Sequence, residues 1–209
     1  MQSSMGVASY LLGEYARAIS LLQGAIPRLE RFGLQERTRA ALSNLAGAHM
    51  MLGQQAQAVR VYARLRDMAR RAKDRTAEAV ALNGMAQAET ALNRPHKALP
   101  LLEEGLRLAQ WLDDPGLIGQ ACNGLMHTYS KLGDHDQAIA YGRRARNEGK
   151  RHGDELMVAL GRHSLGVELA SVGRKGLARR ELKAALEYLE SHGHMQEAQL
   201  AREELEKLA

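Results

Sequence analysis

The chain has 209 residues, a formal net charge of +5 and one cysteine, Cys122. A single cysteine excludes a disulfide framework and suits a reducing compartment, so we expect a cytoplasmic protein. The sequence has no apolar run of roughly 18 residues and no signal-peptide pattern, and we therefore expect no membrane association. The excess of basic residues is moderate and does not by itself indicate nucleic-acid binding.

Five related stretches recur along the chain with a constant spacing of 40 residues. They begin at Leu12, Leu52, Leu92, Leu132 and Val172 and read LGEYARAI, LGQQAQAV, LNRPHKAL, LGDHDQAI and VGRKGLAR. A fixed period of about 20 to 50 residues is typical of solenoids and other repeat arrays. Aromatic residues make up only 4% of the chain and proline occurs four times, as in helical proteins. These features predict an all-α fold, a solenoid of helix pairs.

A second break lies midway through each unit, where Gly ends one helix or Asp begins the next. Examples are Arg31-Phe32-Gly33 and His152-Gly153-Asp154. Pro27 and Pro100 fall inside predicted helices, where each removes one backbone hydrogen bond. The predicted helices are 2–11, 14–32, 35–51, 54–72, 75–91, 95–112, 115–131, 135–152, 155–171, 175–191 and 194–208. The predicted repeats of this single solenoid are 1–33, 34–73, 74–113, 114–153 and 154–193, followed by a capping helix over 194–209.

The two ends of the chain differ. The last helix has a polar face, as a capping element requires. The first helix has no such cap and would expose Val7, Leu11 and Leu12. We therefore expect the chain to be the C-terminal part of a longer repeat protein, and we expect the isolated chain to form an end-to-end homodimer through this helix.

Small residues recur at two places in each unit, where they let neighbouring helices approach closely. The motif Leu-Gly-x-Tyr-x-x-Ala is matched at Leu12, Gly13, Tyr15 and Ala18. The small residues are Gly6, Ala46, Ala86 and Gly166 in the first helices, with Met126 as the exception, and Ala25, Gly105, Ala145 and Ala185 in the second helices, with Leu65 as the exception. This pattern resembles the tetratricopeptide repeat (TPR) over essentially the whole chain. The 40-residue period is similar to the longer variant of the maltose-regulon activator, large LuxR-type bacterial regulators and kinesin light chains.

The resemblance implies a right-handed α-solenoid of antiparallel helix pairs, with a concave groove lined by the first helix of each pair, where such solenoids bind partners. The implied function is protein–protein interaction, with an extended peptide or a partner domain in the groove. The resemblance also suggests the sensor or assembly part of a bacterial transcription regulator. The candidate groove residues are Tyr10, Ser43, Met50, Asn83, Gln87, Asn123, His127 and His163.

Asn83 and Asn123 occupy the same place in successive repeats. A carboxamide both donates and accepts, so two of them could pair with the backbone of a bound peptide without reading its sequence. The alternative interpretation is that both side chains bond to neighbouring helices. The sequence leaves both interpretations open.

No arrangement typical of catalysis occurs in the sequence, so we expect no enzymatic activity, no cofactor and no metal. His127 and His163 would lie on adjacent inner helices, but two histidines without a carboxylate or thiolate make a poor metal site. We expect Cys122 to point into a helix interface, as free cysteines usually do.

Two other functions remain possible from the sequence. The first is a regulatory domain that binds a small-molecule effector and controls self-association. The second is a nucleic-acid scaffold that uses a basic stripe on the outer helices. The stripe comprises Arg60, Arg64, Arg66, Arg70, Arg71, Lys73 and Arg75, then Arg143, Arg144, Arg146, Lys150 and Arg151, then Arg174, Lys175, Arg179, Arg180 and Lys183.

Overall fold

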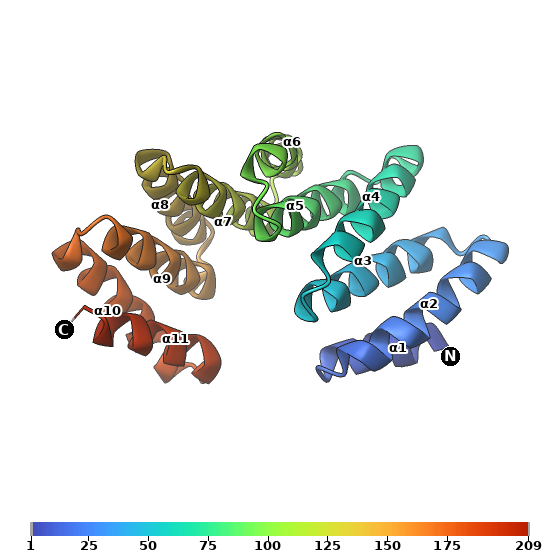
Figure 1. The fold of residues 1–209 in the computed structure, drawn as a ribbon, viewed down its shortest axis with the longest axis horizontal. Coiled ribbons are helices and arrows are strands. Elements are labelled where there is room, and N and C mark those ends of the chain that lie inside the picture. Colours follow the sequence, from blue (N-terminus) through green and yellow to red (C-terminus); the bar gives the residue numbers. More distant parts are fainter. Residues whose placement is uncertain (1, 209) are drawn as a thin grey trace. The chain divides into compact units, whose positions relative to one another are not determined.

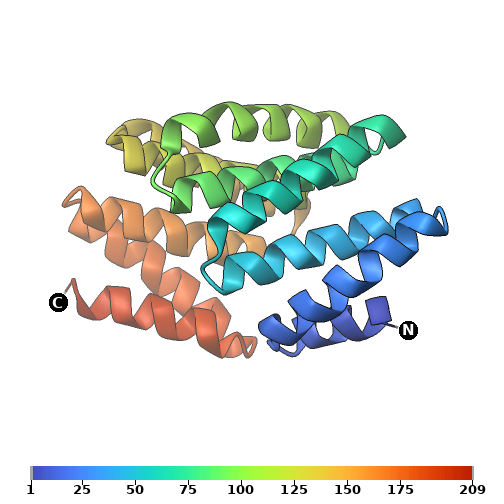
Figure 2. The ribbon, with the colours of Figure 1, turned by 45° about the vertical axis from the view of Figure 1, so that its right-hand side comes forward.

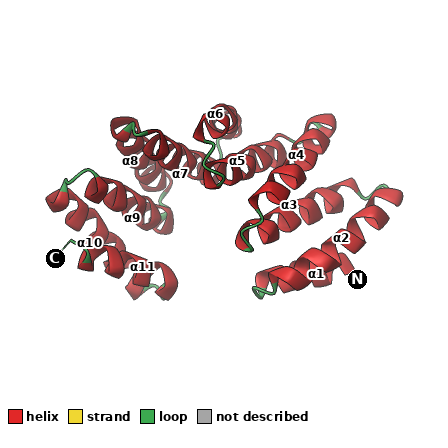
Figure 3. Cartoon of the chain, in the orientation of Figure 1, coloured by secondary structure: helices red, strands yellow, loops and turns green. Residues whose placement is uncertain are grey.

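The computed structural model describes residues 2–208 as eleven α-helices joined by short turns, with no strand in this range (Figures 1 and 3). None of the described helices is long and apolar enough to cross a lipid bilayer. The helices are α1 Gln2–Leu11, α2 Tyr15–Arg31, α3 Gln35–Met51, α4 Gln55–Ala72, α5 Arg75–Ala91, α6 Pro95–Leu112, α7 Pro115–Leu132, α8 His135–His152, α9 Glu155–Ser171, α10 Lys175–Ser191 and α11 Met195–Glu206.

The all-helical prediction is confirmed, and every predicted helix appears within two residues of its expected ends. Pro27 and Pro100 lie inside α2 and α6, as expected. Both prolines are exposed, so water can reach the carbonyl groups that each proline leaves without a partner.

The turns between helices follow a period of 20 residues. Each of the ten turns contains one residue with positive φ, at positions 13, 33, 53 and so on to 193. Glycine fills seven of these positions, because it adopts the left-handed conformation without steric cost. The other three are Lys73, Asn93 and Asp113. Four aspartates then cap the helix that follows, by accepting a hydrogen bond from a backbone N–H three residues on; they are Asp74, Asp114, Asp134 and Asp154.

The chain divides into two compact units, residues 1–108 and 109–209, and each is described by itself. In the first unit, α1, α3 and α5 are inner helices that contact one another in order, and α2 and α4 cover them. In the second unit, α7, α9 and α11 are the inner helices, and α8 and α10 cover them. Figure 2 shows α9, α10 and α11 side by side, as their contacts require.

A contact between a small and a large residue holds the two helices of a pair together. Gly6 of α1 faces Leu22 of α2, and an ideal Cβ atom on Gly6 would lie 2.8 Å from Leu22 Cγ. Gly166 of α9 faces Leu182 of α10 in the same way, at 2.6 Å from Leu182 Cγ. Both leucines are fully buried. Any side chain on these glycines would therefore displace core atoms.

The fourth repeat exchanges the two members of this contact. Met126 stands where the other inner helices have Gly or Ala, and Gly142 stands where the outer helices have Leu or Tyr. An ideal Cβ atom on Gly142 would lie 2.9 Å from Met126 Sδ. Met126 thus fills, from α7, the space that Leu22 fills from α2. This exchange explains why Met126 departs from the small-residue pattern.

We predict that Met126→Ala and Gly142→Leu compensate each other. Met126→Ala alone should leave a cavity and cost about 2–5 kcal/mol of unfolding free energy, and Gly142→Leu alone should cost about 1–3 kcal/mol by overpacking. The double variant restores the Ala–Leu arrangement of another repeat, so it should lose at least about 1 kcal/mol less than the sum of the single variants. Urea unfolding measures all three.

The matched control pairs Gly142→Leu with Met157→Ala, because Met157 packs against Gly119 instead. The losses of unfolding free energy in that pair of variants should be additive. Additive losses for Met126→Ala with Gly142→Leu would contradict the proposed exchange.

Candidate functional site

A pocket of about 190 Å³ lies between the inner helices α7 and α9 of the second unit. The floor comes from Ala145 of α8, and Gly116 and Gly119 leave space along α7. Three apolar side chains of α9 line its other wall: Leu156, Met157 and Leu160. The pocket is therefore largely apolar and is shaped by glycines on α7.

Asn123 provides the pocket with an unpaired polar group. Its side chain is half-buried and lines the pocket. The Oδ1 atom is buried and has no hydrogen-bond partner. A buried acceptor without a partner costs roughly 1–3 kcal/mol, and a ligand N–H that reached this atom after a small movement of the covering side chains would recover that energy. That Asn123 contacts a bound partner stays a prediction.

His127 and His163 lie on the neighbouring helices α7 and α9, as expected. Burial is the main cause that lowers the pKa of each imidazole below its usual value. The charge of His127 lowers the pKa of His163 further, whereas Glu168 and Glu204 oppose the shifts at His127 and His163 respectively. The buried Nε2 atom of His163 has no hydrogen-bond partner. Both rings therefore favour the neutral form, in which each can donate one hydrogen bond and accept another.

We predict that His127→Gln raises the pKa of His163, because the variant removes a neighbouring positive charge. An NMR titration of the His163 ring measures this change. Since the folded pKa lies below the unfolded value of about 6.5, the unfolded chain binds more protons and the native state loses stability as pH falls through this window. His127→Gln should make that loss smaller.

The exposed His96 of α6 offers a control, since His96→Gln should leave the titration of His163 unchanged. An unchanged pKa of His163 in His127→Gln would show that the two rings do not interact.

On the inner surface of the first unit, a tyrosine side chain covers the glycine of the next inner helix. The half-buried Tyr10 of α1 covers Gly47 of α3, and an ideal Cβ atom on Gly47 would lie 2.8 Å from the Tyr10 hydroxyl oxygen. Burial, aided by Tyr10, raises the pKa of Tyr62 to about 12. Of the other candidates in this unit, Ser43 and Met50 are half-buried and Gln87 is exposed.

Asn83 occupies the same repeat position as Asn123, but it does not lie on an open surface. Its side chain is only 1% exposed. An ideal Cβ atom on Gly105 of α6 would lie 2.6 Å from Asn83 Oδ1, so the carboxamide is covered by that helix. The physical reason is the glycine: Gly105 admits the side chain, whereas the fourth repeat has Ala145 at the same position. Neither polar end of the Asn83 carboxamide has a hydrogen-bond partner.

A second, more polar hollow of about 570 Å³ lies at the turns of the second unit, lined by residues of the α7–α8 and α9–α10 connections. His135 contacts the buried Glu168 at 2.8 Å, and Arg174 lies 3.6 Å from Asp136. The contact between His135 and Glu168 joins residues 33 positions apart, which no local sequence pattern could reveal. Two carboxylates near the hollow, those of Glu168 and Asp136, therefore already have partners.

Cys122 is fully buried, as predicted, and burial raises its thiol pKa to about 11. The thiol therefore stays protonated and unreactive at neutral pH. Within residues 2–208, no three His, Cys, Asp or Glu side chains come together as a metal site. Leu11 and Leu12 are 77% and 75% exposed. The homodimer expected through this end of the chain stays a prediction.

Residues 37–110 match the family model of the tetratricopeptide repeat. No curated protein sequence matches the chain. The likeness to the tetratricopeptide repeat family thus covers residues 37–110, and solved structures extend the likeness in fold to nearly the whole chain.

Three of these structures illustrate the likeness. A signal transduction ATPase with numerous domains (STAND) from Pyrococcus horikoshii, which has a tetratricopeptide repeat sensor, superposes with a TM-score of 0.79 at 19% identity; the match covers 98% of this chain and 31% of that protein. A putative kinesin light chain from Podosopora anserina, with nearly identical TPR-like repeats, gives 0.73 at 15% identity, with 92% and 95% covered. A Rap protein complexed with Competence and Sporulation Factor gives 0.70 at 15% identity, with 99% and 62% covered. The chain thus spans about a third of the STAND protein and somewhat less than two thirds of the Rap protein.

Proposed function

We propose that this tetratricopeptide repeat chain is a protein-interaction module whose second unit binds an extended peptide along α7 and α9. The observation that carries the proposal is the unpaired Oδ1 atom of Asn123 beside an apolar pocket. An extended peptide presents one backbone N–H and one C=O at each non-proline residue, and its side chains alternate in direction. One backbone N–H can therefore donate to Asn123 Oδ1 while a neighbouring side chain enters the pocket.

The size of the pocket favours a peptide over a small-molecule effector. Pockets for small molecules usually measure about 300–1,000 Å³, and the pocket beside Asn123 measures about 190 Å³. Its apolar wall and small volume suit one aliphatic side chain, such as Leu, Ile or Met. We therefore assign the binding energy to one buried apolar side chain and to backbone hydrogen bonds.

His127 and His163 extend the proposed surface. Because their pKa values are lowered, both rings are neutral near pH 7 and add no charge to the surface. Each neutral ring offers one donor or acceptor to a peptide backbone. The surface therefore suits an uncharged peptide segment and does not select acidic or basic ones.

The comparisons support a role in sensing or assembly within a larger protein. The Rap protein was solved with Competence and Sporulation Factor, and the STAND protein carries a tetratricopeptide repeat sensor. We propose by analogy that the present chain is the ligand-sensing or assembly part of a longer regulator. One form of this proposal is that the longer protein regulates transcription.

We predict that Asn123→Ala weakens peptide binding about 5- to 10-fold, because one hydrogen bond of about 1 kcal/mol or slightly more is lost. The probe is a fluorescent peptide selected on the chain from a random-peptide phage library. Selected peptides should share an aliphatic residue at one fixed position. Fluorescence polarisation measures the affinity of each variant.

Two further variants sharpen this experiment. Asn147→Ala on the outer helix α8 is the matched control and should leave the affinity unchanged, since Asn147 is exposed away from the pocket. Gly116→Leu should narrow the pocket and shift the selected residue toward Ala or Val, because a Cβ atom at Gly116 meets only Asp114 Oδ1, at 3.3 Å. Equal affinities for Asn123→Ala and the unmodified chain would contradict the proposal.

A further inference from the structure

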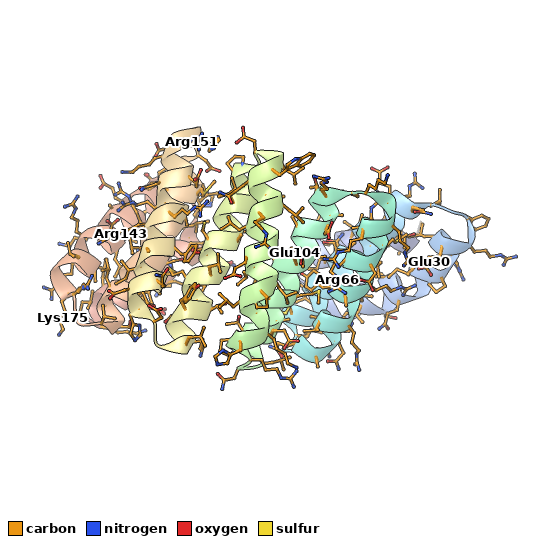
Figure 4. The ribbon with its side chains drawn as sticks, turned by 90° about the horizontal axis from the view of Figure 1, so that it is seen from above. Glu30, Arg66, Glu104, Arg143, Arg151 and Lys175 are labelled. Atoms are coloured by element: carbon orange, nitrogen blue, oxygen red, sulfur yellow. The ribbon has the colours of Figure 1, made fainter. Side chains whose placement is uncertain are left out.

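The outer helices of the two units differ in how many of their basic residues form ion pairs. In the first unit, carboxylates neutralise three arginines of α4, and Figure 4 shows Arg66 on the same surface as Glu30 and Glu104. The ion pairs are Arg64 with Glu30, Arg66 with Asp67, and Arg70 with both Glu78 and Glu104. Three of the seven basic residues in the densest basic run of the sequence are therefore paired with carboxylates.

The outer helices of the second unit carry basic side chains that no described carboxylate neutralises. Six exposed basic side chains on α8 and α10 make no ion pair or hydrogen bond with any residue that the structure describes: Arg143, Lys150, Arg151, Lys175, Arg180 and Lys183. Figure 4 shows Arg143 and Arg151 along α8 and Lys175 at the start of α10. Arg146 of α8 pairs with Glu181 of α10 at 2.6 Å, so one ion pair joins the helices that carry the six free charges.

This basic face has few of the apolar groups that a protein partner would need. Interfaces between proteins depend on buried aromatic or aliphatic anchors. Among the described residues of α8 and α10, Leu177 alone is an exposed large hydrophobic side chain. The two tyrosines of these helices, Tyr141 and Tyr188, are half-buried and stack on Tyr129 and His192. Neither ring is free to stack on an unpaired base, which argues against single-stranded nucleic acid.

We propose that the outer face of α8 and α10 binds a nucleic-acid duplex through its backbone phosphates, without reading its sequence. Arg143 and Lys150 are two helical turns apart, about 10 Å along α8, and Arg180 and Lys183 are nearly one turn apart on α10. Unpaired Arg and Lys side chains on two linked helices can therefore contact several phosphates at once. This face is formed by outer helices and the peptide surface by inner ones, so the two proposals are independent.

The test is binding of the whole chain to a fluorescent DNA duplex of arbitrary sequence, measured by polarisation between 50 and 200 mM salt. Four or more phosphate contacts predict a slope of about −4 in log affinity against log salt, a loss of roughly 100-fold or more over this range. The double substitution Arg143→Glu/Lys183→Glu should weaken binding at least about 10-fold, and Arg143→Ala/Lys183→Ala should reduce the slope by about two.

The matched control is Arg60→Glu/Lys97→Glu, which changes the net charge equally on exposed residues of the first unit. It should change affinity less than about twofold in the same salt series. Equal weakening by both double variants would overturn the proposal, since binding would then follow net charge alone. Absence of binding at the lowest salt, or equal binding of a poly-glutamate peptide, would also overturn it. An RNA duplex that binds as the DNA duplex does would support recognition of phosphates alone.

Discussion

The close approach of the helices is the constraint on which the rest of the structure depends. At Gly161 of α9, an ideal Cβ atom would lie 2.9 Å from both the backbone N and the Cα of Arg146 in α8. Backbone atoms cannot move aside as a flexible side chain can, so only glycine fits there. The same logic places Gly6 against Leu22 and Gly142 against Met126. These contacts fix the distance between helices, and that distance decides which side chains face the pocket and which are covered.

Inner and outer helices use their polar residues for different purposes. Inner helices bury polar atoms that lack protein partners, at Asn123 Oδ1 and His163 Nε2. Such atoms are costly in a core but useful at a surface that takes hydrogen bonds from a ligand. Outer helices carry charges that stay in water. In the first unit carboxylates pair with three arginines of α4, and in the second unit six basic side chains of α8 and α10 have no partner among the described residues. The second unit therefore combines two inner-surface imidazoles that favour the neutral form with a basic outer surface.

The sequence predicted the fold well because local sequence patterns determine where the helices and turns lie. The 40-residue period located all eleven helices, and glycine and aspartate located the turns. The sequence could not show that Asn83 and Asn123 differ in burial, because they share one register position. Their difference comes from Gly105 in the following helix, which lets Asn83 be covered.

The sequence also could not show which arginines are neutralised. Arg64 and Glu30 are 34 positions apart, as are Arg70 and Glu104. Contacts of this kind depend on how one repeat stacks on the next, and composition does not reveal that stacking. The pocket beside Asn123 escaped prediction for the same reason, because its walls come from two successive repeats. Met126 was recognised as an exception to the small-residue pattern, yet its partner Gly142 became evident only from the structure.

The central claim is that a peptide ligand lies on the inner surface formed by α7 and α9. The most direct measurement is a ¹⁵N–¹H chemical-shift map of the labelled chain with and without a library-selected peptide. The account predicts the largest shifts at the Asn123 side-chain NH₂ and at the backbone amides of Gly119 and Leu160. Shifts confined to α8 and α10, or to the first unit, would contradict it.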